Sequence, residues 1–311
     1  MLARYVNIKE EPGFALCLQG QSADWINLEN PTPEELAQVA AELDVPPLFL
    51  ADPLDAMEKP RVDQEDEATL LIIRLPVHKN DDGDHQFGTI PLGMILVKEK
   101  LITVCSKPSL AQDILSRGNR KPRPLSQLKM VMKIFIESSI DFMTHLELME
   151  DITDIAESAL SKAQHNEQIM TLLRIDKALI NYTVALKSNR AIIKKLLEGN
   201  IVPLPEADGN LLDHALTEIQ QAIDMAEIYG QILGSLGDAF GNIINNNLNK
   251  IMKLLTGVTI ILMLPTLIVG AYGMNLVLPM AQHPKAFWIV AILCLLSSGG
   301  VWIFFWRKKW I

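Results

Sequence analysis

The hydrophobic and polar positions follow three different patterns along this chain. Short runs rich in Ile, Leu and Val predict buried strands, the last two of them forming a hairpin, at residues 68–75, 92–97 and 101–105. From Leu125 to Leu197 apolar residues recur every three or four positions with almost no Pro or Gly, which predicts long amphipathic helices. Towards the C-terminus the periodicity gives way to two long uncharged runs.

Residues 1–120 are expected to form a mixed α/β domain. Thr32, Pro33 and Glu35 have the spacing of a capping box with proline at the first helical position, which predicts a helix that ends near Leu43. The segment 80–84, Asn-Asp-Asp-Gly-Asp, lacks the spaced ligands and terminal Glu of a calcium-binding loop. It predicts a solvated turn between two strands.

A further long helix is expected to begin near Leu211, after the helix breakers Pro203 and Pro205. Up to Tyr272 the only interruptions are Gly residues and Pro265. The pattern therefore predicts a stalk helix that continues unbroken into the first of the two uncharged runs.

The two uncharged runs have the length of membrane spans. Residues 254–272 and 286–306 contain 19 and 21 residues, close to the ~20 that a helix needs to cross the hydrocarbon. The N-terminal segment lacks an apolar core, so we expect no cleavable signal and a body that stays in the cytoplasm. Lys and Arg flank the inner ends of both runs, which predicts a multi-pass protein of the cytoplasmic (inner) membrane with both termini in the cytoplasm.

The charge is distributed unevenly. Residues 250–311 hold six of the 28 Lys and Arg and none of the 37 Asp and Glu, so residues 1–249 carry a formal charge of −15. An acidic body on a basic, apolar tail disfavours nucleic acid as a partner and favours cations and a membrane. Cys17, Cys105 and Cys294 form no CxxC pair, which argues against a disulfide scaffold or structural zinc, and we expect them to be buried small hydrophobes.

No catalytic pattern is present in the sequence. The six histidines form no HExxH motif and no ligand-spaced pair with Cys, and there is neither a GxxxxGK[ST] loop nor a GxSxG motif. Neither uncharged run contains a carboxylate or a histidine. We therefore expect no enzymatic activity.

A short motif at the outer end of the first span carries a family resemblance. Tyr272 precedes Gly273, Met274 and Asn275, and a short loop and a second C-terminal span follow. With the acidic body and basic terminus, this arrangement resembles the CorA family of divalent-cation channels over the whole chain. The resemblance implies an α+β cytoplasmic domain, long stalk helices and two C-terminal transmembrane helices in a funnel-shaped homopentamer. It also implies that Gly273, Met274 and Asn275 form the selectivity filter.

Counting back from Asn275 by threes and fours gives a stripe along the stalk helix that the resemblance assigns to the pore. Small polar residues alternate in it with apolar ones: Asn249, Met252, Leu255, Thr259, Met263, Thr266 and Gly270. Met252 and Leu255 are expected to form an apolar gate. Without the Gly-Met-Asn motif, ordinary helix packing explains the same stripe.

Two aspartates occupy positions where the family has acidic residues. Asp238 matches a ring near the inner pore mouth, and Asp213 lies where the family has a regulatory cation ligand between subunits. The partner carboxylate is expected from the α/β domain and stays open among Asp63, Glu65, Asp66 and Glu67. Bound intracellular Mg²⁺ is expected to close the channel. For any one of these acids, a solvated surface carboxylate is the competing interpretation.

The identity of the transported ion is left open in part. Many family members carry an acid in the outer loop, but residues 276–285 read LVLPMAQHPK and have none. We place Mg²⁺ first, then Co²⁺ and Ni²⁺, with Zn²⁺ transport of the ZntB-like branch or a membrane-anchored scaffold as alternatives. The expected domains are 1–120 (α/β), 121–249 (long helices and stalk) and 250–311 (membrane), with an outer loop at 273–285.

Overall fold

The structure is a computed structural model that describes residues 1–7, 14–17, 23–81, 84–107, 111, 113, 126–160, 166–198, 209–274, 284–308 and 310. The chain divides into two compact units, Met1–Leu233 and Gly234–Ile311, and their boundary lies inside the long helix α6. The three-part division at residues 120 and 249 stays a prediction. The first unit is called the body below, and the second the helix pair.

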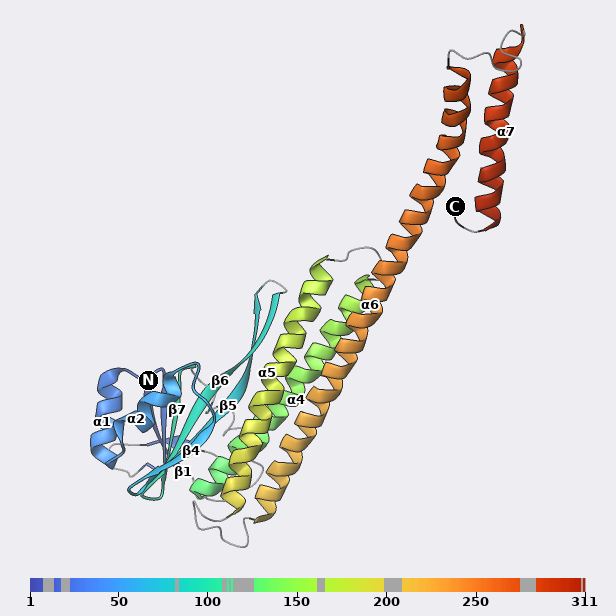
Figure 1. The fold of residues 1–311 in the computed structure, drawn as a ribbon. Coiled ribbons are helices and arrows are strands. Elements are labelled where there is room, and N and C mark those ends of the chain that lie inside the picture. The colour runs from blue at the N-terminus through green and yellow to red at the C-terminus, as the bar shows by residue number, and fades with distance from the viewer. Residues whose placement is uncertain are drawn as a thin grey trace. The chain divides into compact units, whose positions relative to one another are not determined.

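The body contains a mixed sheet with the strand order β2-β1-β3-β7-β6-β5-β4 (Figure 1). Strands β3 and β7 run parallel, and the other neighbouring strands run antiparallel. The strand bounds are β1 (Leu2–Asn7), β2 (Phe14–Leu16), β3 (Trp25–Glu29), β4 (Arg61–Glu65), β5 (Ala68–Asp81), β6 (Asp84–Val97) and β7 (Lys100–Cys105).

The predicted hairpin between β6 and β7 is confirmed. Its turn places Lys98 at φ 48° and Glu99 at φ 62°, the two left-handed positions of a type I′ turn. Strands β5 and β6 are longer than predicted, because their outer arms pair up to Asp81 opposite Asp84 with fewer apolar residues than the buried cores. Residues 82–83 of the predicted polar turn lie outside the described residues.

Three short helices cover one face of the sheet: α1 (Pro33–Leu43), α2 (Pro47–Ala51) and η1 (Asp52–Leu54). The capping box is confirmed, since the Glu35 N–H donates to Thr32 Oγ1 at 3.3 Å and the Thr32 N–H donates to Glu35 Oε2 at 3.0 Å. Helix α1 ends at Leu43, as predicted.

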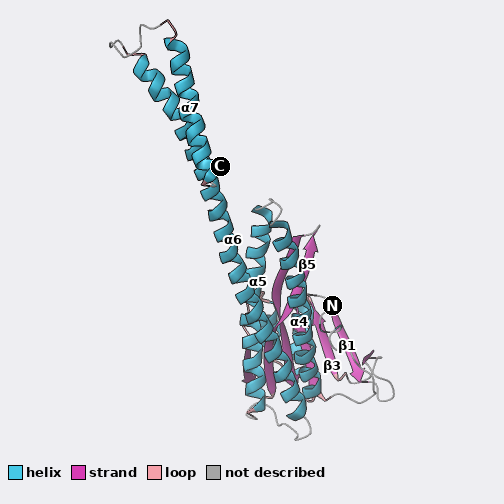
Figure 2. Cartoon of the chain, turned by 90° about the vertical axis from the view of Figure 1, so that its right-hand side faces the viewer, coloured by secondary structure: helices cyan, strands magenta, loops and turns pink. Residues whose placement is uncertain are grey.

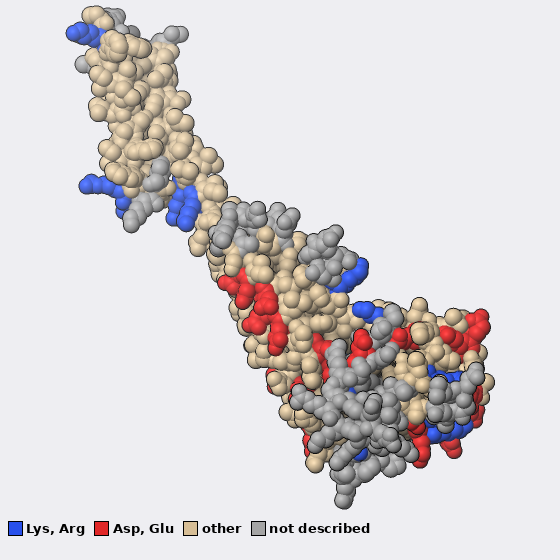
Figure 3. All heavy atoms as spheres, turned by 180° about the vertical axis from the view of Figure 1, so that it is seen from behind, with Lys and Arg blue, Asp and Glu red and all other residues tan. Residues whose placement is uncertain are grey.

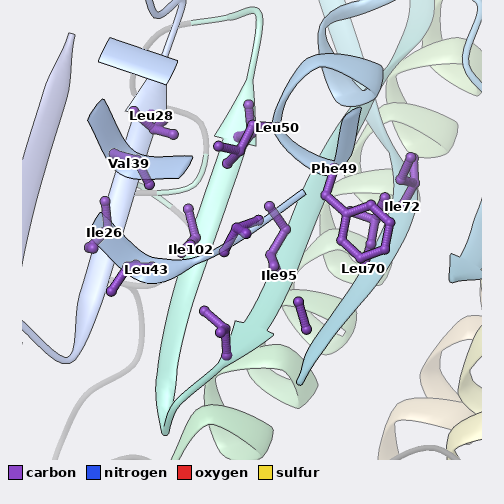
Figure 4. Close-up of a cluster of buried hydrophobic side chains, with 14 of the residues drawn as sticks. Ile26, Leu28, Val39, Leu43, Phe49, Leu50, Leu70, Ile72, Ile95 and Ile102 are labelled. Atoms are coloured by element: carbon purple, nitrogen blue, oxygen red, sulfur yellow. The ribbon is translucent and has the colours of Figure 1, made fainter. Parts of the chain in front are cut away.

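A core of buried hydrophobic side chains lies between these helices and the sheet (Figure 4). Val39 and Leu43 from α1 and Leu50 from α2 point towards Ile26 and Ile102 on the neighbouring strands β3 and β7 (Figure 4). Helix η1 packs directly on β6 at Gly93, so this position has no room for a side chain. A Cβ there would lie 2.3 Å from Pro53 Cγ.

The other face of the sheet is covered by α4 (Gln127–Leu160) and α5 (Asn166–Leu197), which confirms the predicted long amphipathic helices (Figure 2). Phe142 of α4 meets Tyr182 of α5 edge to face with ring centroids 4.9 Å apart. Both side chains are fully buried. The N-terminal part of α6 joins these helices, with Lys187 Nζ 2.6 Å from Glu227 Oε1.

Helix α6 (Gly209–Tyr272) is continuous to the end of the first predicted span, as the sequence predicts, with Pro265 inside it. The expected break at Pro203 and Pro205 lies outside the described residues. Helix α7 (Ala286–Arg307) matches the second predicted span. Among the described residues, two helices are long and apolar enough to cross a membrane: the one that ends at Tyr272 and α7.

One expectation on the cysteines is only partly right. All three are free thiols, and Cys105 in the central strand β7 is buried, but Cys17 and Cys294 are half-buried. Cys17 follows the edge strand β2, where a neighbouring strand covers one side only. Cys294 lies in the helix pair, where a single partner helix covers one face.

Candidate ion pathway

The span of α6 has two different faces. On one face Gly257 is buried and the side chains of Ile261, Leu264, Pro265 and Ile268 are half-buried. Contacts from α7 reach this face, since Ser298 Oγ lies 3.3 Å from the Ile261 carbonyl oxygen and Cys294 Sγ lies 3.9 Å from that of Pro265. Helix α7 runs beside this part of α6 in both views (Figures 1 and 2).

The stripe that the sequence analysis singled out lies on the opposite face. At about 100° per residue, its positions are centred on the far side of α6 from Ile261. All seven of its residues are exposed in the single chain: Asn249, Met252, Leu255, Thr259, Met263, Thr266 and Gly270. Contact with α7 therefore does not account for this stripe.

The polar members of the stripe present oxygen acceptors. The hydroxyl of Thr259 donates to the Leu255 carbonyl at 2.8 Å, and that of Thr266 donates to the Leu262 carbonyl at 2.9 Å. With its proton directed at its own helix, each hydroxyl keeps lone pairs that accept hydrogen bonds from water. A hydrated cation is surrounded by such water donors.

The apolar members of the stripe are large and exposed. Met252, Leu255 and Met263 expose 54%, 60% and 65% of their surface in the single chain. They alternate along the helix with the oxygen-bearing positions. A ring of such side chains repels water at the constriction, whereas a ring of hydroxyls or amides retains it.

The chain turns at the end of the first span. Helix α6 ends at Tyr272, the Gly273 N–H donates to the Val269 carbonyl at 2.9 Å, and Met274 follows in a bend. A Cβ on Gly273 would lie 3.3 Å from the Val269 oxygen, so a larger residue at this turn would require that carbonyl to shift by a few tenths of an ångström. Asn275, the third residue of the expected filter, lies outside the described residues.

Charged groups in the described part of residues 250–311 are confined to the ends of the two spans (Figure 3). Lys250, Lys253, Arg307 and Lys308 are at one end, Lys285 is at the other, and residues 250–311 contain no Asp or Glu. The stripe is consequently neutral throughout. A neutral pathway holds a divalent cation through its hydration shell rather than by direct charge pairing.

The expected regulatory aspartates are both exposed. Asp213 lies near the start of α6 in the body, and Asp238 lies in the part of α6 assigned to the helix pair. Among the described residues of this single chain, no three or more His, Cys, Asp or Glu side chains form a group able to hold a metal ion. Asp63, one of the four open partners, has its carboxylate 2.5 Å from Arg61 Nε.

An exposed row of carboxylates lies on α4, and Figure 3 shows acidic side chains gathered on the helices of the body. The row comprises Glu147, Glu150, Asp151 and Asp154. The Tyr229 hydroxyl of α6 donates to Glu150 Oε2 at 2.7 Å. This hydrogen bond connects the carboxylate row on α4 to the part of α6 that lies within the body.

Three groups in the structure were not anticipated from the sequence. Asn189 of α5 is fully buried and makes two hydrogen bonds to the backbone of Arg74 on β5, accepting from its N–H at 3.0 Å and donating to its carbonyl at 2.8 Å. Pairing between β4 and β5 ends at Ile72, so this amide takes the place of the missing strand. Ser298, described above, is the second group.

The third unanticipated group is a cluster of histidines between the sheet and α4. His78 Nε2 lies 2.9 Å from His85 Nδ1, and His145 Nδ1 lies 2.9 Å from the Tyr182 hydroxyl. Burial lowers the pKa of His145 to about 4, helped by His78 and Lys107 and opposed by Asp141. These residues are far apart in the sequence, so only the fold brings them together.

A comparison with protein families now identifies the group to which this chain belongs. The family model described as "CorA-like Mg2+ transporter protein" matches residues 20–309. The chain belongs to this family. The match confirms the resemblance inferred from the Gly-Met-Asn motif. The CorA family consists of membrane transporters of divalent cations and is not a family of enzymes.

Individual relatives agree with this result. The cobalt/magnesium transport protein CorA of Methanocaldococcus jannaschii is 29% identical over 92% of this chain and 91% of its own length. The complete structure of the CorA magnesium transporter from the same organism superposes with a TM-score of 0.84 at 24% identity, covering 100% of this chain and 99% of that one. The fold class predicted from the sequence is therefore confirmed for the single chain.

A more distant structural neighbour is a cytoplasmic domain. The cytoplasmic domain of ZntB from Vibrio parahaemolyticus superposes with a TM-score of 0.59 at 15% identity, over 78% of this chain and 98% of that one. At this identity the likeness concerns the fold alone. The filter, the pore stripe, the regulatory aspartates and the homopentamer stay predictions for this chain.

Proposed function

We propose that this chain forms a homopentameric channel in the cytoplasmic membrane, with Mg²⁺ as its main ion and Co²⁺ and Ni²⁺ as further ions. The observation that carries the proposal is the neutral stripe on α6, which faces away from α7 and alternates oxygen-bearing with apolar side chains. Two spans cannot enclose a pore, so several copies must contribute their stripes. The names of CorA relatives as magnesium and cobalt transport proteins support the choice of ions.

The proposed orientation places both termini in the cytoplasm. Lys250, Lys253, Arg307 and Lys308 lie at the inner ends of the two spans. The outer connection holds a single lysine, Lys285, in agreement with the excess of positive charge on cytoplasmic segments. A cation would enter at the Gly-Met-Asn end and leave along the stalk.

Selection at the filter rests on hydration. Mg²⁺ gives up its six waters reluctantly, so a filter that accepts hydrogen bonds from those waters admits the ion without dehydrating it. In the proposed pentamer, five Asn275 side-chain oxygens supply neutral acceptors, and the small Gly273 lets the chain turn beside them. Direct carboxylate ligands would bind the ion too tightly for rapid release.

The gate in this proposal is the apolar level formed by Met252 and Leu255. When five copies approach closely, these side chains exclude water, and a hydrated cation cannot pass. Thr259 and Asn249 on either side keep the pore wet above and below that level. Opening then requires only that the stalk helices move apart enough to rewet the ring.

Regulation is proposed to depend on Asp213 and Asp238. Crowding of acidic bodies around a fivefold axis is unfavourable, and cytoplasmic cations bridging carboxylates of neighbouring subunits relieve it. A bound cation favours the closed state only as far as it binds that state more tightly. Loss of the aspartates should therefore leave the filter intact and weaken closure.

The decisive experiment is Mg²⁺ flux into liposomes that contain the purified full-length protein and an internal Mg²⁺ dye. Asn275→Ala should abolish flux, whereas Gln282→Ala in the same outer connection should leave it unchanged. Assembly of both variants is checked by mass measurement in detergent. Absence of flux from the correctly assembled unmodified protein would favour the membrane-anchored scaffold, and wild-type flux from Asn275→Ala would remove the filter from the proposal.

Zinc transport is the second candidate, favoured by the outer connection without a carboxylate. Competition in the same liposomes separates the two ions. Excess external Mg²⁺ should block Co²⁺ and Ni²⁺ entry if Mg²⁺ is the main ion. Zn²⁺ entry that persists under the same excess would transfer the assignment to zinc.

Regulation has its own test. Asp213→Asn and Asp238→Asn should maintain flux when the liposomes are loaded with Mg²⁺ at a concentration that closes the unmodified protein. Glu34→Gln, an exposed carboxylate of α1, serves as the control and should close normally. Normal closure in both aspartate variants would show that they are ordinary surface acids.

A further inference from the structure

Pro265 leaves one carbonyl of α6 without its helical partner. In an α-helix the N–H of each residue donates to the carbonyl four residues earlier, and proline has no N–H. The carbonyl of Ile261 therefore cannot receive its usual hydrogen bond. In hydrocarbon no water is available to replace that bond, so an alternative donor is strongly favoured.

Helix α6 does not supply that donor from its nearest hydroxyl. Thr266 follows Pro265 directly, but its hydroxyl donates to the Leu262 carbonyl at 2.9 Å. The donor comes from the neighbouring helix instead. Ser298 of α7 has its Oγ 3.3 Å from the Ile261 carbonyl oxygen.

The adjacent serine shows that this contact is specific to one position. Ser297 donates to the Cys294 carbonyl of its own helix at 2.9 Å, so its proton stays within α7. One turn away from Ser298, the Cys294 thiol lies 3.9 Å from the Pro265 carbonyl oxygen, a weak second contact. The pairs 298 with 261 and 294 with 265 have the same four-residue spacing, as expected for antiparallel helices in register.

We propose that Ser298 replaces the missing amide of Pro265 and ties α7 to α6 at the level of the proline. This inference rests on the proposed function for its consequence, because Ser298 then acts as a positioning residue for the pore. The contact lies on the face of α6 opposite the stripe. Thr266, Gly270 and the turn at Gly273 follow the proline, so the tie fixes the segment that leads to the filter.

A double-mutant cycle on the full-length protein in lipid nanodiscs tests the proposal, with the midpoint of thermal unfolding as the readout. Ser298→Ala should lower the midpoint by about 1–2 °C, the size expected for one hydrogen bond between membrane helices. Pro265→Ala restores the amide and the helical bond, so adding Ser298→Ala to it should cause no further loss. Ser298→Thr keeps the hydroxyl and should behave as the unmodified protein, as should the control Ser297→Ala.

An equal loss from Ser298→Ala in both backgrounds would overturn the proposal, because it would show simple packing. If Pro265→Ala does not fold, a comparison of the unfolding midpoints of Ser298→Thr and Ser298→Val tests the same hydrogen bond. These two side chains have nearly the same shape and differ by the hydroxyl, so equal midpoints contradict the proposal and a lower midpoint for valine supports it. None of these readouts requires transport, so loss of the channel hypothesis and loss of this one are distinguishable.

The consequence for the pore is measured separately in liposomes. Ser298→Ala should reduce Mg²⁺ selectivity over Ca²⁺ or the flux itself by at least twofold, and Ser298→Thr should restore it. Unchanged flux and selectivity in an Ser298→Ala protein with a lowered midpoint would overturn the positioning role.

Discussion

Asn189 in the body and Ser298 in the helix pair both form hydrogen bonds with backbone groups that lack their regular partner, but the two regions of the molecule differ in polarity. Each side chain completes the hydrogen bonding of a backbone segment that lost its regular partner, a strand edge beside Arg74 and the Ile261 carbonyl below Pro265. The Asn189 side chain is fully buried, but the surface of the body around it is charged. The helix pair has no Asp or Glu in residues 250–311, so its polar groups depend on one another.

The two regions also differ in where charged side chains occur. In the body, Arg61 contacts Asp52 and Asp63, and the stalk contributes Glu227 to a pair with Lys187. Surface pairs of this kind contribute little to stability. On the face of the α6 span opposite α7, all polar side chains that the structure describes are neutral. This arrangement suits a hydrated cation.

The largest expected effect comes from placing one carboxylate on each face of the α6 span. Ile261→Asp puts a charge on the half-buried face against α7, at a cost of about 3 kcal/mol, and should abolish membrane insertion or assembly. Thr259→Asp puts the same charge on the stripe, where water is expected. It should assemble normally. Quantitative blotting of the membrane fraction and mass measurement in detergent compare the two, and equal loss from both would contradict a wet stripe.

Removal of the Asn189 amide should have the next largest effect. Asn189→Ala leaves the N–H and carbonyl of Arg74 unpaired in a partly buried setting, which we expect to destabilise the body by about 2–3 kcal/mol. Asn181→Ala, an exposed position on the same helix, is the matched control with the same change of helix propensity. Urea unfolding followed by circular dichroism measures both. Similar midpoints for the two variants would show that water replaces the amide.

Acid should weaken the body through the histidine cluster. Burial lowers the pKa of His145 in the folded protein to about 4, below its usual value of 6.5, so the unfolded chain binds the proton first as the pH falls. The stability due to neutral His145 is complete above pH 6.5 and declines as the pH falls towards 4. Partial exposure reduces the full linkage value to about 2 kcal/mol.

The variant His145→Gln tests this pH dependence. Glutamine keeps a polar contact for the Tyr182 hydroxyl but does not titrate. Its unfolding free energy should change less between pH 6.5 and pH 4 than that of the unmodified protein. Some pH dependence should stay, because burial also lowers the pKa of the neighbouring His78. Parallel pH profiles would remove His145 from the acid sensitivity.

The sequence predicted the parts that follow from local chemistry and periodicity. The capping box at Thr32, the hairpin at Lys98 and Glu99, and the continuous helix through Pro265 depend on neighbouring residues and were correctly placed. The polar arms of β5 and β6 were missed because their apolar signal is weak.

Contacts between distant segments were not predictable in the same way. Asn189 is 115 residues from Arg74, and Ser298 is 37 residues from Ile261, so no local pattern connects either pair. Pro265 did give a signal, since a proline inside a membrane helix always leaves a carbonyl that needs a donor. The stripe on α6 was predictable because helical spacing alone fixes which residues share a face.

The smallest expected effect concerns the apolar ring of the proposed gate, and it separates the stripe from its neighbours. Leu255→Ser replaces an exposed apolar side chain of the stripe by a hydroxyl that retains water, so Mg²⁺ leak should rise about fivefold, equivalent to ~1 kcal/mol of barrier. Leu254→Ser makes the same change one position away, about 100° around the helix. Both leucines are exposed in the single chain, so equal leak in the two variants, measured in liposomes with assembly preserved, would mean that the stripe packs against protein or lipid and does not line the pore.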